Sequence, residues 1–577
     1  MAARLTAYLV VAIVGATLIA GLIVGAQRDD NDGPVDVIIH NAKVYTAGPD
    51  GEMAEAVAIR GNQVLRVGSE REIQRLSRPQ TTVIDAKGGA VLPGFADSHA
   101  HLVEGGVGLE RVDLRGAATV EEVQQRIRAW AATHPDAPWI LGNGWSAATF
   151  PGGAPTRQQL DAVVADRPAH MLGEGGRAAW MNTRALRLGG ITKATAAPAA
   201  GTIVKDARTG EPTGVLRESA VALVERLIPG PTRADRARAV RTAIDEAHRH
   251  GVTSVHHVDA DADDLELFAD ARRDGDMLLR VYAALALKGV MTEAEIDELD
   301  RLASRYPDDP LLKGGAVSID LDGTLETRTA AMLEPYADGT VAGTPSIDPD
   351  AFNRMVRLLD ARGWQVLSWA AGDRAVQMSL NAFEHAVRSN RVPGRGRRHR
   401  VEHVETIDAA DVPRFGALGV TASFQPAAGT PTDARVEFLQ AALGPARAAR
   451  AWACASIAAA GGRLVFGSDW PHAPFDPIAG LHVAVTRTDP EGVPDEAWNP
   501  AERVALKAAI DAYTSSAAWA SFDEQRKGTL APGMLADLVV LSEDIFEAPP
   551  ARLAATRVAV TVFDGKIVYR RDGNSTN

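Results

Sequence analysis

Two histidines separated by one residue are the clearest chemical feature of this 577-residue chain. His99 and His101 stand in the segment Gly-Phe-Ala-Asp-Ser-His-Ala-His-Leu, residues 94–102, at the end of a short apolar run. In a β-strand, side chains at positions i and i+2 point the same way, so the two imidazoles share one face. A His-x-His pair at the C-terminal end of a strand therefore supplies half of a metal site.

Other apolar runs of the chain also end in polar side chains. His256 and His257 end one run, His403 ends another, and Asp469 follows a third. If these strand ends converge, a divalent metal held there polarises a carbonyl group and lowers the pKa of its water toward about 7. Asp469 could contact the metal and accept the proton of the attacking water. The pattern predicts metal-assisted hydrolysis.

Eight apolar, β-branched runs must position these residues, and most of them are followed by a helical stretch. The runs are Val91–His101, Val252–Val258, Leu278–Leu285, Ala316–Leu321, Gln365–Trp369, Arg400–Val404, Val420–Phe424 and Leu464–Ser468. This alternation is typical of a parallel sheet covered by helices. Eight such units close a (β/α)8 barrel, whose active site lies at the C-terminal strand ends. We predict an α/β protein with a TIM barrel over residues 93–525.

Other segments interrupt or flank the barrel. Residues from about 103 to 235 are too many for one β/α connection and predict an insertion that covers the barrel mouth. Short β-rich runs divided by Gly and Asn turns fill residues 35–92. Similar runs, with Asp564-Gly565 as a hairpin turn, fill residues 526–577. The two ends of the chain are predicted to build one composite β-sandwich domain.

The N-terminus, residues 1–34, has a different character. From Leu5 to Ala26 about 22 residues carry no charge, enough for a helix to cross a hydrocarbon core of about 30 Å. Arg4 precedes this segment and a mostly acidic run follows it, so the positive-inside rule places the body of the protein outside the cytoplasm. We expect a single-pass anchor in the cell membrane with an extracytoplasmic catalytic domain. Val24-Gly25-Ala26 resembles a signal-peptidase site, so a secreted or periplasmic protein is the alternative.

The composition excludes several kinds of partner and site. The 74 acidic residues outnumber the 61 basic ones and give a formal net charge of -13, which disfavours binding to nucleic acid. Cys454 is the single cysteine, which excludes an internal disulfide and a cysteine-based zinc cluster. Any metal ligands must therefore be imidazoles and carboxylates.

Ordered sequence blocks extend over nearly the whole chain after residue 34. They include Leu92-Pro-Gly-Phe-Ala-Asp-Ser-His-Ala-His, Ile140-Leu-Gly-Asn-Gly-Trp, Trp180-Met-Asn-Thr-Arg-Ala-Leu, Val401-Glu-His, Phe424-Gln-Pro and Gly467-Ser-Asp-Trp-Pro. In these blocks the chain resembles the amidohydrolase superfamily. Within it, the chain is similar to the branch of large metal-dependent hydrolases, amidohydrolase family 3, that includes N-substituted formamide deformylase.

The resemblance implies a hydrolase that acts on a non-peptide C–N bond, such as an amide or formamide, in a small-molecule substrate. It also implies a metal site built from the first-strand His pair, a carboxylated lysine on the fourth strand, one His each on the fifth and sixth strands, and an Asp on the eighth. Four residues of this chain match those positions, namely His99, His101, His403 and Asp469. Asp469 is also the predicted catalytic residue, as the acceptor of the proton of the attacking water.

Three residues depart from the family pattern. Ser318 stands at the lysine position, Trp369 stands at the fifth-strand His position, and Arg177 replaces a histidine of the insertion that faces the site in relatives. A hydroxyl cannot form a carbamate bridge, and an indole N–H offers no lone pair to a metal, so the usual two-metal centre is not expected. The remaining three imidazoles and one carboxylate suit a single zinc ion with a position left for water.

Two alternatives remain at this point. Asp320, two residues beyond Ser318 on the same strand face, could supply a substitute carboxylate, and His256 could supply an imidazole from the second strand. The other alternative is a catalytically silent binding protein, in which Trp369 plugs the barrel or forms a ligand surface with Arg177. The fold alone does not decide between an enzyme and a binding protein. The retained Asp469 favours the enzyme.

Overall fold

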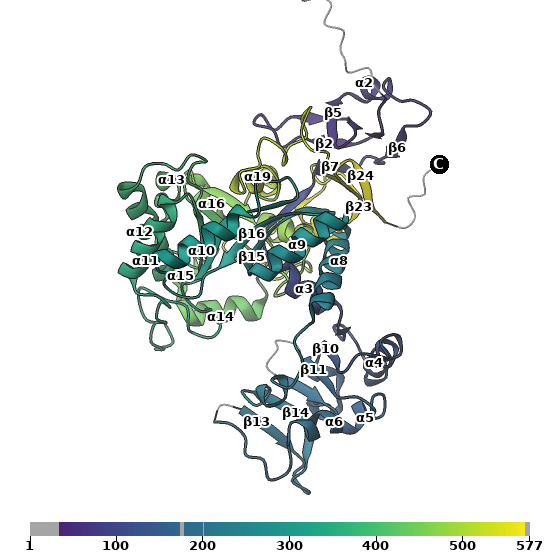
Figure 1. The fold of residues 1–577 in the computed structure, drawn as a ribbon, viewed down its shortest axis with the longest axis vertical. Helices are drawn as coiled ribbons and strands as arrows, with labels where there is room; N and C mark the ends of the chain where they lie inside the picture. The colour runs from purple at the N-terminus through teal and green to yellow at the C-terminus, as the bar shows by residue number, and fades with distance from the viewer. Residues whose placement is uncertain (1–33, 174–177, 200, 572–577) are drawn as a thin grey trace, which may run out of the picture.

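A barrel of eight parallel strands forms the centre of the computed structural model, which describes residues 34–173, 178–199 and 201–571 (Figure 1). The strands are β8 (Phe95–Ala100), β15 (Val252–Ala260), β16 (Arg280–Ala286), β17 (Leu312–Asp320), β18 (Gln365–Ala370), β19 (Arg400–His403), β20 (Thr421–Phe424) and β21 (Arg463–Phe466). Each strand pairs in parallel with the next of these strands, from β8 to β21. Each of the eight predicted runs overlaps a barrel strand, but the run Val91–His101 is divided between β7 (Ala90–Pro93) of another sheet and β8.

The barrel closes through a short joint between its first and last strands. Just beyond β21, Trp470 forms an isolated parallel bridge with Ala100 of β8. The N–H of Asp469 donates to the carbonyl of His99 at 2.8 Å, and the N–H of His101 donates to the carbonyl of Trp470 at 2.8 Å. The barrel is thus nearly closed, and its joint lies at the C-terminal strand ends beside the His-x-His pair.

Helices cover the outside of the barrel. They are α3 (Leu102–Leu109), α8 (Arg233–Arg249), α9 (Ala262–Asp274), α10 (Glu293–Ser304), α11 (Pro349–Ala361), α12 (Asp373–Ser389), α13 (Val412–Leu418), α14 (Asp433–Leu443), α15 (Pro445–Ala448), α16 (Cys454–Ala459), α17 (Pro477–Thr486), α18 (Leu506–Ala512) and α19 (Ser515–Ala520). In α12, Val376, Leu380 and Phe383 recur at helical spacing and are fully buried. Their burial in the main apolar cluster holds this helix on the sheet.

Strands from both ends of the chain share one sheet, as predicted. Its order is β24-β23-β22-β7-β2-β3, and a second sheet has the order β5-β4-β1-β6. The members are β1 (Val37–His40), β2 (Lys43–Tyr45), β3 (Met53–Ala54), β4 (Ala56–Arg60), β5 (Gln63–Gly68), β6 (Thr82–Asp85), β7 (Ala90–Pro93), β22 (Leu538–Leu541), β23 (Val558–Phe563) and β24 (Lys566–Arg570), with α2 (Glu70–Gln74) alongside. β22 pairs antiparallel with β7, and one apolar cluster contains residues of both sheets.

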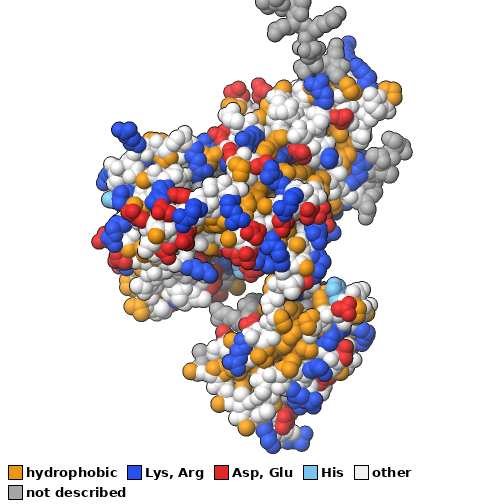
Figure 2. Space-filling model, in the orientation of Figure 1, with side chains coloured by type: hydrophobic (Ala, Val, Ile, Leu, Met, Phe, Trp, Pro, Cys, Tyr) orange, Lys and Arg blue, Asp and Glu red, His pale blue; other side chains and the backbone are white. Residues whose placement is uncertain are grey.

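Between α3 and α8 the chain forms a lobe with its own sheet, in the order β13-β14-β12-β11-β10-β9. Its elements are β9 (Val112–Asp113), α4 (Val120–Thr133), β10 (Ile140–Trp145), α5 (Arg157–Asp161), β11 (Ala169–Gly173), β12 (Ala178–Met181), α6 (Thr183–Leu188), β13 (Gly201–Lys205), β14 (Pro212–Glu218) and α7 (Ala222–Glu225). The lobe has apolar clusters of its own. Figures 1 and 2 show it below the barrel, joined to the rest of the molecule by a narrow neck.

Two of the sequence predictions fall on residues that the structure does not describe. The apolar segment Leu5–Ala26 and Arg177 lie outside the described residues. Among the helices of residues 34–173, 178–199 and 201–571, none is both long and apolar enough to cross a membrane.

Candidate metal centre

His99, His101 and Asp469 meet at the C-terminal end of the barrel. Each offers one ligand atom, and these atoms all lie within 4.8 Å of one another. Oδ1 of Asp469 lies 3.5 Å from Nε2 of His99 and 3.4 Å from Nε2 of His101. The histidines lie at the end of β8 and Asp469 follows β21, so the joint that closes the barrel also brings the three side chains together.

His403 lies beside this cluster. Its ring centroid is 5.1 Å from that of His99, in an edge-to-face arrangement. The Nε2 atom of His403 is buried and has no hydrogen-bond partner among the described residues, although buried ring nitrogens normally have one. A lone pair left unused in this position is what a metal ligand requires.

The other ring nitrogen of each histidine faces a carboxylate. The three pairs are His99 Nδ1 with Glu402 Oε2 at 2.9 Å, His101 Nδ1 with Asp259 Oδ2 at 3.6 Å, and His403 Nδ1 with Glu405 Oε1 at 3.4 Å. A carboxylate at Nδ1 favours the tautomer that carries its hydrogen there and leaves the Nε2 lone pair available. Metal-binding histidines are commonly held in this way, so the residues present fit a divalent metal ion.

Unusual backbone conformations direct two of these side chains. His403 has a φ of +71° and Asp469 has a φ of +64°, values that are uncommon outside glycine and that cluster at functional sites. Arg400 contacts His256 of β15 and Glu402 contacts His99 of β8, so both point into the barrel from alternate positions of β19. A regular strand would turn the intervening and following side chains away. The turn at His403 changes that direction at the end of the strand.

Charge at the site is balanced by buried groups of opposite sign. Burial would raise the pKa of Glu402, but Arg400 and His99 lower it to about 2. Burial would also raise the pKa of Asp469, but the surrounding His101, His403 and His99 lower it to about 2. Both carboxylates are therefore ionised at neutral pH, so Glu402 can accept the Nδ1 hydrogen of His99 and Asp469 can offer an oxygen to a metal ion.

The histidines of the second barrel strand have other contacts. Nη1 of Arg400 lies 2.7 Å from Nδ1 of His256, and burial together with Arg400 lowers the pKa of His256 well below its usual range. Nδ1 of His257 accepts the N–H of Leu102 at 3.1 Å, at the start of α3. The structure therefore uses His256 inside the barrel and His257 to anchor a helix, and it does not bring either one to the cluster.

The two family departures that the structure describes are both close to the site. Oγ of Ser318 donates to Oδ1 of Asp259 at 2.8 Å and accepts the N–H of Asp259 at 3.1 Å. The ring of Trp369 lies 4.8 Å from that of His403 and packs against the main apolar cluster. Asp320 forms no ion pair with a described histidine, and burial and the charge of Asp259 raise its pKa. Trp369 is partly buried at the strand ends beside His403.

The sequence analysis missed the three carboxylates that face the histidines. A signal existed for Glu402, because it shares one strand face with Arg400 and stands next to His403. No comparable signal exists for Asp259, whose contact with His101 joins two different strands.

A hollow of about 1040 Å³ opens at the same strand ends. His101, Asp259 and His472 line it from the barrel, while Asn143 and Leu172 line it from the insertion. A hollow of this size, with a few polar groups at one end, suits a small molecule. The insertion therefore supplies one side of the space next to the cluster.

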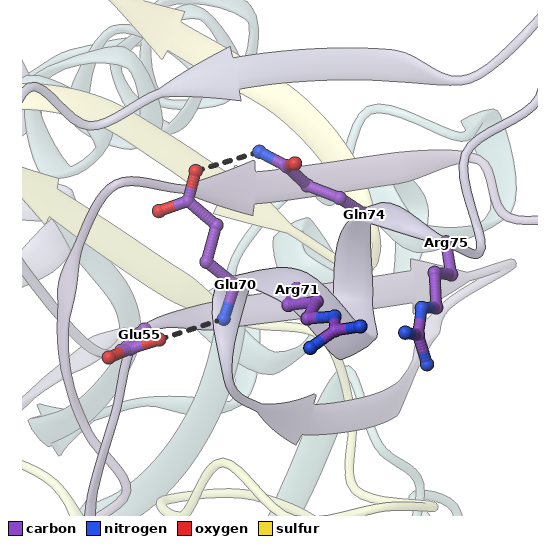
Figure 3. A pocket seen from close by; sticks show the side chains of 5 residues that line it. All are labelled: Glu55, Glu70, Arg71, Gln74 and Arg75. Atoms are coloured by element: carbon purple, nitrogen blue, oxygen red, sulfur yellow. Dashed lines mark hydrogen bonds between the residues drawn. The ribbon is translucent and has the colours of Figure 1, made fainter.

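Another hollow, of about 600 Å³, lies at α2 in the domain built from the chain ends (Figure 3). Its lining residues are Glu55, Glu70, Arg71, Gln74 and Arg75. Gln74 donates to Glu70 at 2.7 Å, and the N–H of Glu70 donates to Glu55 at 3.0 Å. These bonds link Glu55, Glu70 and Gln74, and the described lining residues do not include a group of metal ligands.

Several known proteins resemble this chain over most of its length. A model described as "Amidohydrolase family" matches residues 82–569. Protein LONG AFTER FAR-RED 3 of Arabidopsis thaliana is 30% identical over 92% of this chain and 91% of its own length. N-substituted formamide deformylase of Arthrobacter pascens is 27% identical over 93% of this chain and 99% of its own length. The solved structure of an uncharacterized metal-dependent hydrolase from Pyrococcus furiosus is 26% identical, with a TM-score of 0.67, over 87% of this chain and 97% of that one.

Proposed function

This chain belongs to the amidohydrolase family of metal-dependent hydrolases, and from that premise we propose that it hydrolyses a non-peptide C–N bond through a single zinc ion. The proposed ligands are His99, His101, His403 and Asp469. The proposed substrate is a small molecule with an amide or formamide group, because one relative with coverage of nearly the whole chain is an N-substituted formamide deformylase. The hollow at the strand ends is the proposed binding site.

One observation carries the proposal of a metal centre. Three imidazoles turn Nδ1 toward carboxylates, and at two of them Nε2 lies within 3.5 Å of Asp469. The third, His403, has a buried Nε2 without a partner among the described residues. Nitrogen and carboxylate oxygen donors of this number match zinc, and Ser318 and Trp369 leave no ligands for a second ion of the usual kind.

The reaction follows from the position of Asp469. A bound zinc ion supplies a Lewis acid that polarises the carbonyl and lowers the pKa of water. The Asp469 carboxylate, ionised at neutral pH, accepts a proton as the water oxygen bonds to the substrate carbon. It then returns the proton to the substrate nitrogen as the C–N bond breaks. The products are a carboxylic acid and an amine.

The proposed location rests on the sequence. Leu5–Ala26 is uncharged and long enough to span a bilayer, and the charges beside it favour an outside position for the rest of the chain. We propose a membrane-anchored enzyme with its site outside the cytoplasm, or a secreted or periplasmic enzyme if the segment is removed.

Elemental analysis of the purified full chain tests the metal centre. The expected result is about one zinc per chain, together with hydrolysis in a screen of amides and formamides. The double variant His99→Ala/His101→Ala is expected to lose both. His385→Ala, at an exposed histidine of α12, is the matched control and should keep both.

Two other results would contradict the proposal. Two zinc ions per chain would show that the site is binuclear despite Ser318 and Trp369. No bound metal after reconstitution with zinc would favour the catalytically silent binding protein.

A further inference from the structure

We propose that Asp259, held in place by Ser318, is a positioning residue that orients His101 for the metal. The inference rests on the proposed zinc centre and concerns the orientation of one of its ligands. It gives a role to Ser318, the residue at which this chain departs from the metal-bridging lysine of its relatives. It also identifies a carboxylate that the sequence motifs do not point to.

Ser318 holds Asp259 by two hydrogen bonds. The serine hydroxyl donates to Oδ1 of the Asp259 side chain at 2.8 Å and accepts the Asp259 backbone N–H at 3.1 Å. Ser318 itself is buried, with 6% of its surface exposed. Because both bonds end on one residue, the serine fixes the backbone and the carboxylate of Asp259 together. A lysine side chain at position 318 could not make this short two-point contact.

The conformation of Asp259 needs such support. Asp259 has a φ of +57°, in the left-handed region that non-glycine residues rarely adopt. Its side chain is 42% exposed toward the hollow, so packing alone does not hold it. A residue in a rare conformation persists where its surroundings determine it, and here the contact with Ser318 does so.

The two carboxylate oxygens of Asp259 have different neighbours. Oδ1 accepts the Ser318 hydroxyl, while Oδ2 lies 3.6 Å from Nδ1 of His101. His101 Nε2, on the other side of the ring, lies 3.4 Å from Asp469. Asp259 therefore favours the His101 tautomer that has its hydrogen on Nδ1 and its lone pair aimed at the metal centre.

The same task is done differently at the other two histidines. His99 and His403 are faced by Glu402 and Glu405, which lie on or just after β19. His101, from the same strand end as His99, is faced instead by Asp259 of β15. Ser318 of β17 donates a hydrogen bond to Asp259 of β15, although β16 lies between these two strands.

The competing candidate is Asp320, two residues beyond Ser318. It belongs to the same strand, and burial and the charge of Asp259 raise its pKa while His101 and His403 lower it, but it forms no ion pair with a described histidine. It is therefore the matched carboxylate for an experiment.

Zinc affinity of the full chain, measured by competition with a chromophoric chelator, tests the inference. Asp259→Asn is expected to weaken zinc binding by about 10–100-fold, as loss of such a partner does elsewhere. Ser318→Ala should weaken it in the same direction by less. The double variant should match Asp259→Asn alone, because Ser318 acts through Asp259. Asp320→Asn should bind zinc within about 3-fold of the wild type, well below the change expected at Asp259.

A spectroscopic measurement separates positioning from general destabilisation. Substitution with Co²⁺ gives visible bands that depend on ligand geometry, and we expect these bands to shift in Asp259→Asn and to remain unchanged in Asp320→Asn. The urea unfolding midpoint of each metal-free variant should stay close to that of the wild type. If Asp259→Asn does not fold, Ser318→Ala provides the same comparison.

The possible failures are distinguishable. Zinc binding by the wild type with an unchanged affinity in Asp259→Asn overturns this inference and leaves the proposed function in place. A further loss of zinc affinity when Ser318→Ala is added to Asp259→Asn also overturns the inference. A larger loss of zinc affinity in Asp320→Asn than in Asp259→Asn overturns it as well. A wild-type chain that binds no zinc overturns both the inference and the proposed function.

Discussion

At the scale of single residues, the two ring nitrogens of each imidazole at the site have different neighbours. Nδ1 of His99 contacts the buried Glu402, while its Nε2 faces Asp469. The Asp469 carboxylate is ionised, since the neighbouring imidazoles lower its pKa to about 2 although burial raises it. Asp469, the proposed proton acceptor, is therefore ionised over the whole neutral range.

Asp469→Asn tests that role directly. The amide has no site for the proton of the attacking water, so we expect kcat/KM at saturating zinc to fall by at least about 100-fold, with the fold retained. Steady-state kinetics and circular dichroism measure the two effects. Asp495→Asn, at an exposed loop position, should keep wild-type activity. Undiminished turnover in Asp469→Asn would exclude Asp469 as the base.

At the scale of elements, the C-terminal end of α8, which follows the insertion, contacts the N-terminal end of α17. His250 caps the C-terminus of α8, and Asp476 caps the N-terminus of α17 by accepting the N–H of Ile478. His250 lies 3.7 Å from Asp476 and 3.2 Å from Glu246. Burial opposes the charge on His250, but the two carboxylates prevail and raise its pKa to about 9. The imidazolium therefore links the two helix ends.

This link predicts a pH dependence of stability. The folded pKa of about 9 exceeds the unfolded value near 6.5, so the contribution of His250 is complete below pH 6.5 and is lost as pH rises to 9. Because the pair is partly exposed, we expect His250→Gln to lower the free energy of unfolding by on the order of 1–2 kcal/mol at pH 6.5 and by less at pH 9.

Urea unfolding at pH 6.5, 7.5 and 9 measures the effect. His385→Gln, at an exposed histidine with no partner that the structure records, should follow the wild type at each pH. A difference between wild type and His250→Gln that stays constant with pH would contradict the assignment.

At the scale of the whole molecule, the composite β domain is fixed to the barrel at the end opposite the metal centre. Arg280 is the first residue of β16 and is 3% exposed. It donates to Asp537 at 2.5 and 2.9 Å and to Asp564 at 2.9 Å, both in the C-terminal part of the chain. The N-terminal face of such a barrel serves stability, while the C-terminal face carries the chemistry.

Arg280→Ala tests the separation of these faces. Removal of one partner from a buried ion pair leaves Asp537 uncompensated, and we expect a loss of about 3–5 kcal/mol in the free energy of unfolding. Arg272→Ala, at an exposed pair with Asp309, should cost at most about 1 kcal/mol. Urea denaturation measures both. Zinc affinity should be unchanged in Arg280→Ala, and a parallel loss of zinc would show that the two faces are coupled.

Local patterns in the sequence were enough to predict most of the fold and the family of this protein. The eight barrel strands, the sheet shared by the chain ends and the family followed from apolar runs, turn residues and ordered motifs. The relation between His99 and His101 was readable because the i, i+2 geometry of a strand is local. The membrane segment Leu5–Ala26 stays a prediction from the same kind of pattern.

Only the tertiary structure decided which groups meet across strands. The pairing of His101 with Asp259, the support of Asp259 by Ser318 and the enclosure of His256 by Arg400 each join different strands of the barrel. Strand order, register and a few residues with positive φ set these contacts, and none of them leaves a periodic trace in the sequence. The proposed ligands could therefore be predicted from local spacing and the family resemblance, whereas the carboxylates that face them depend on the closed barrel.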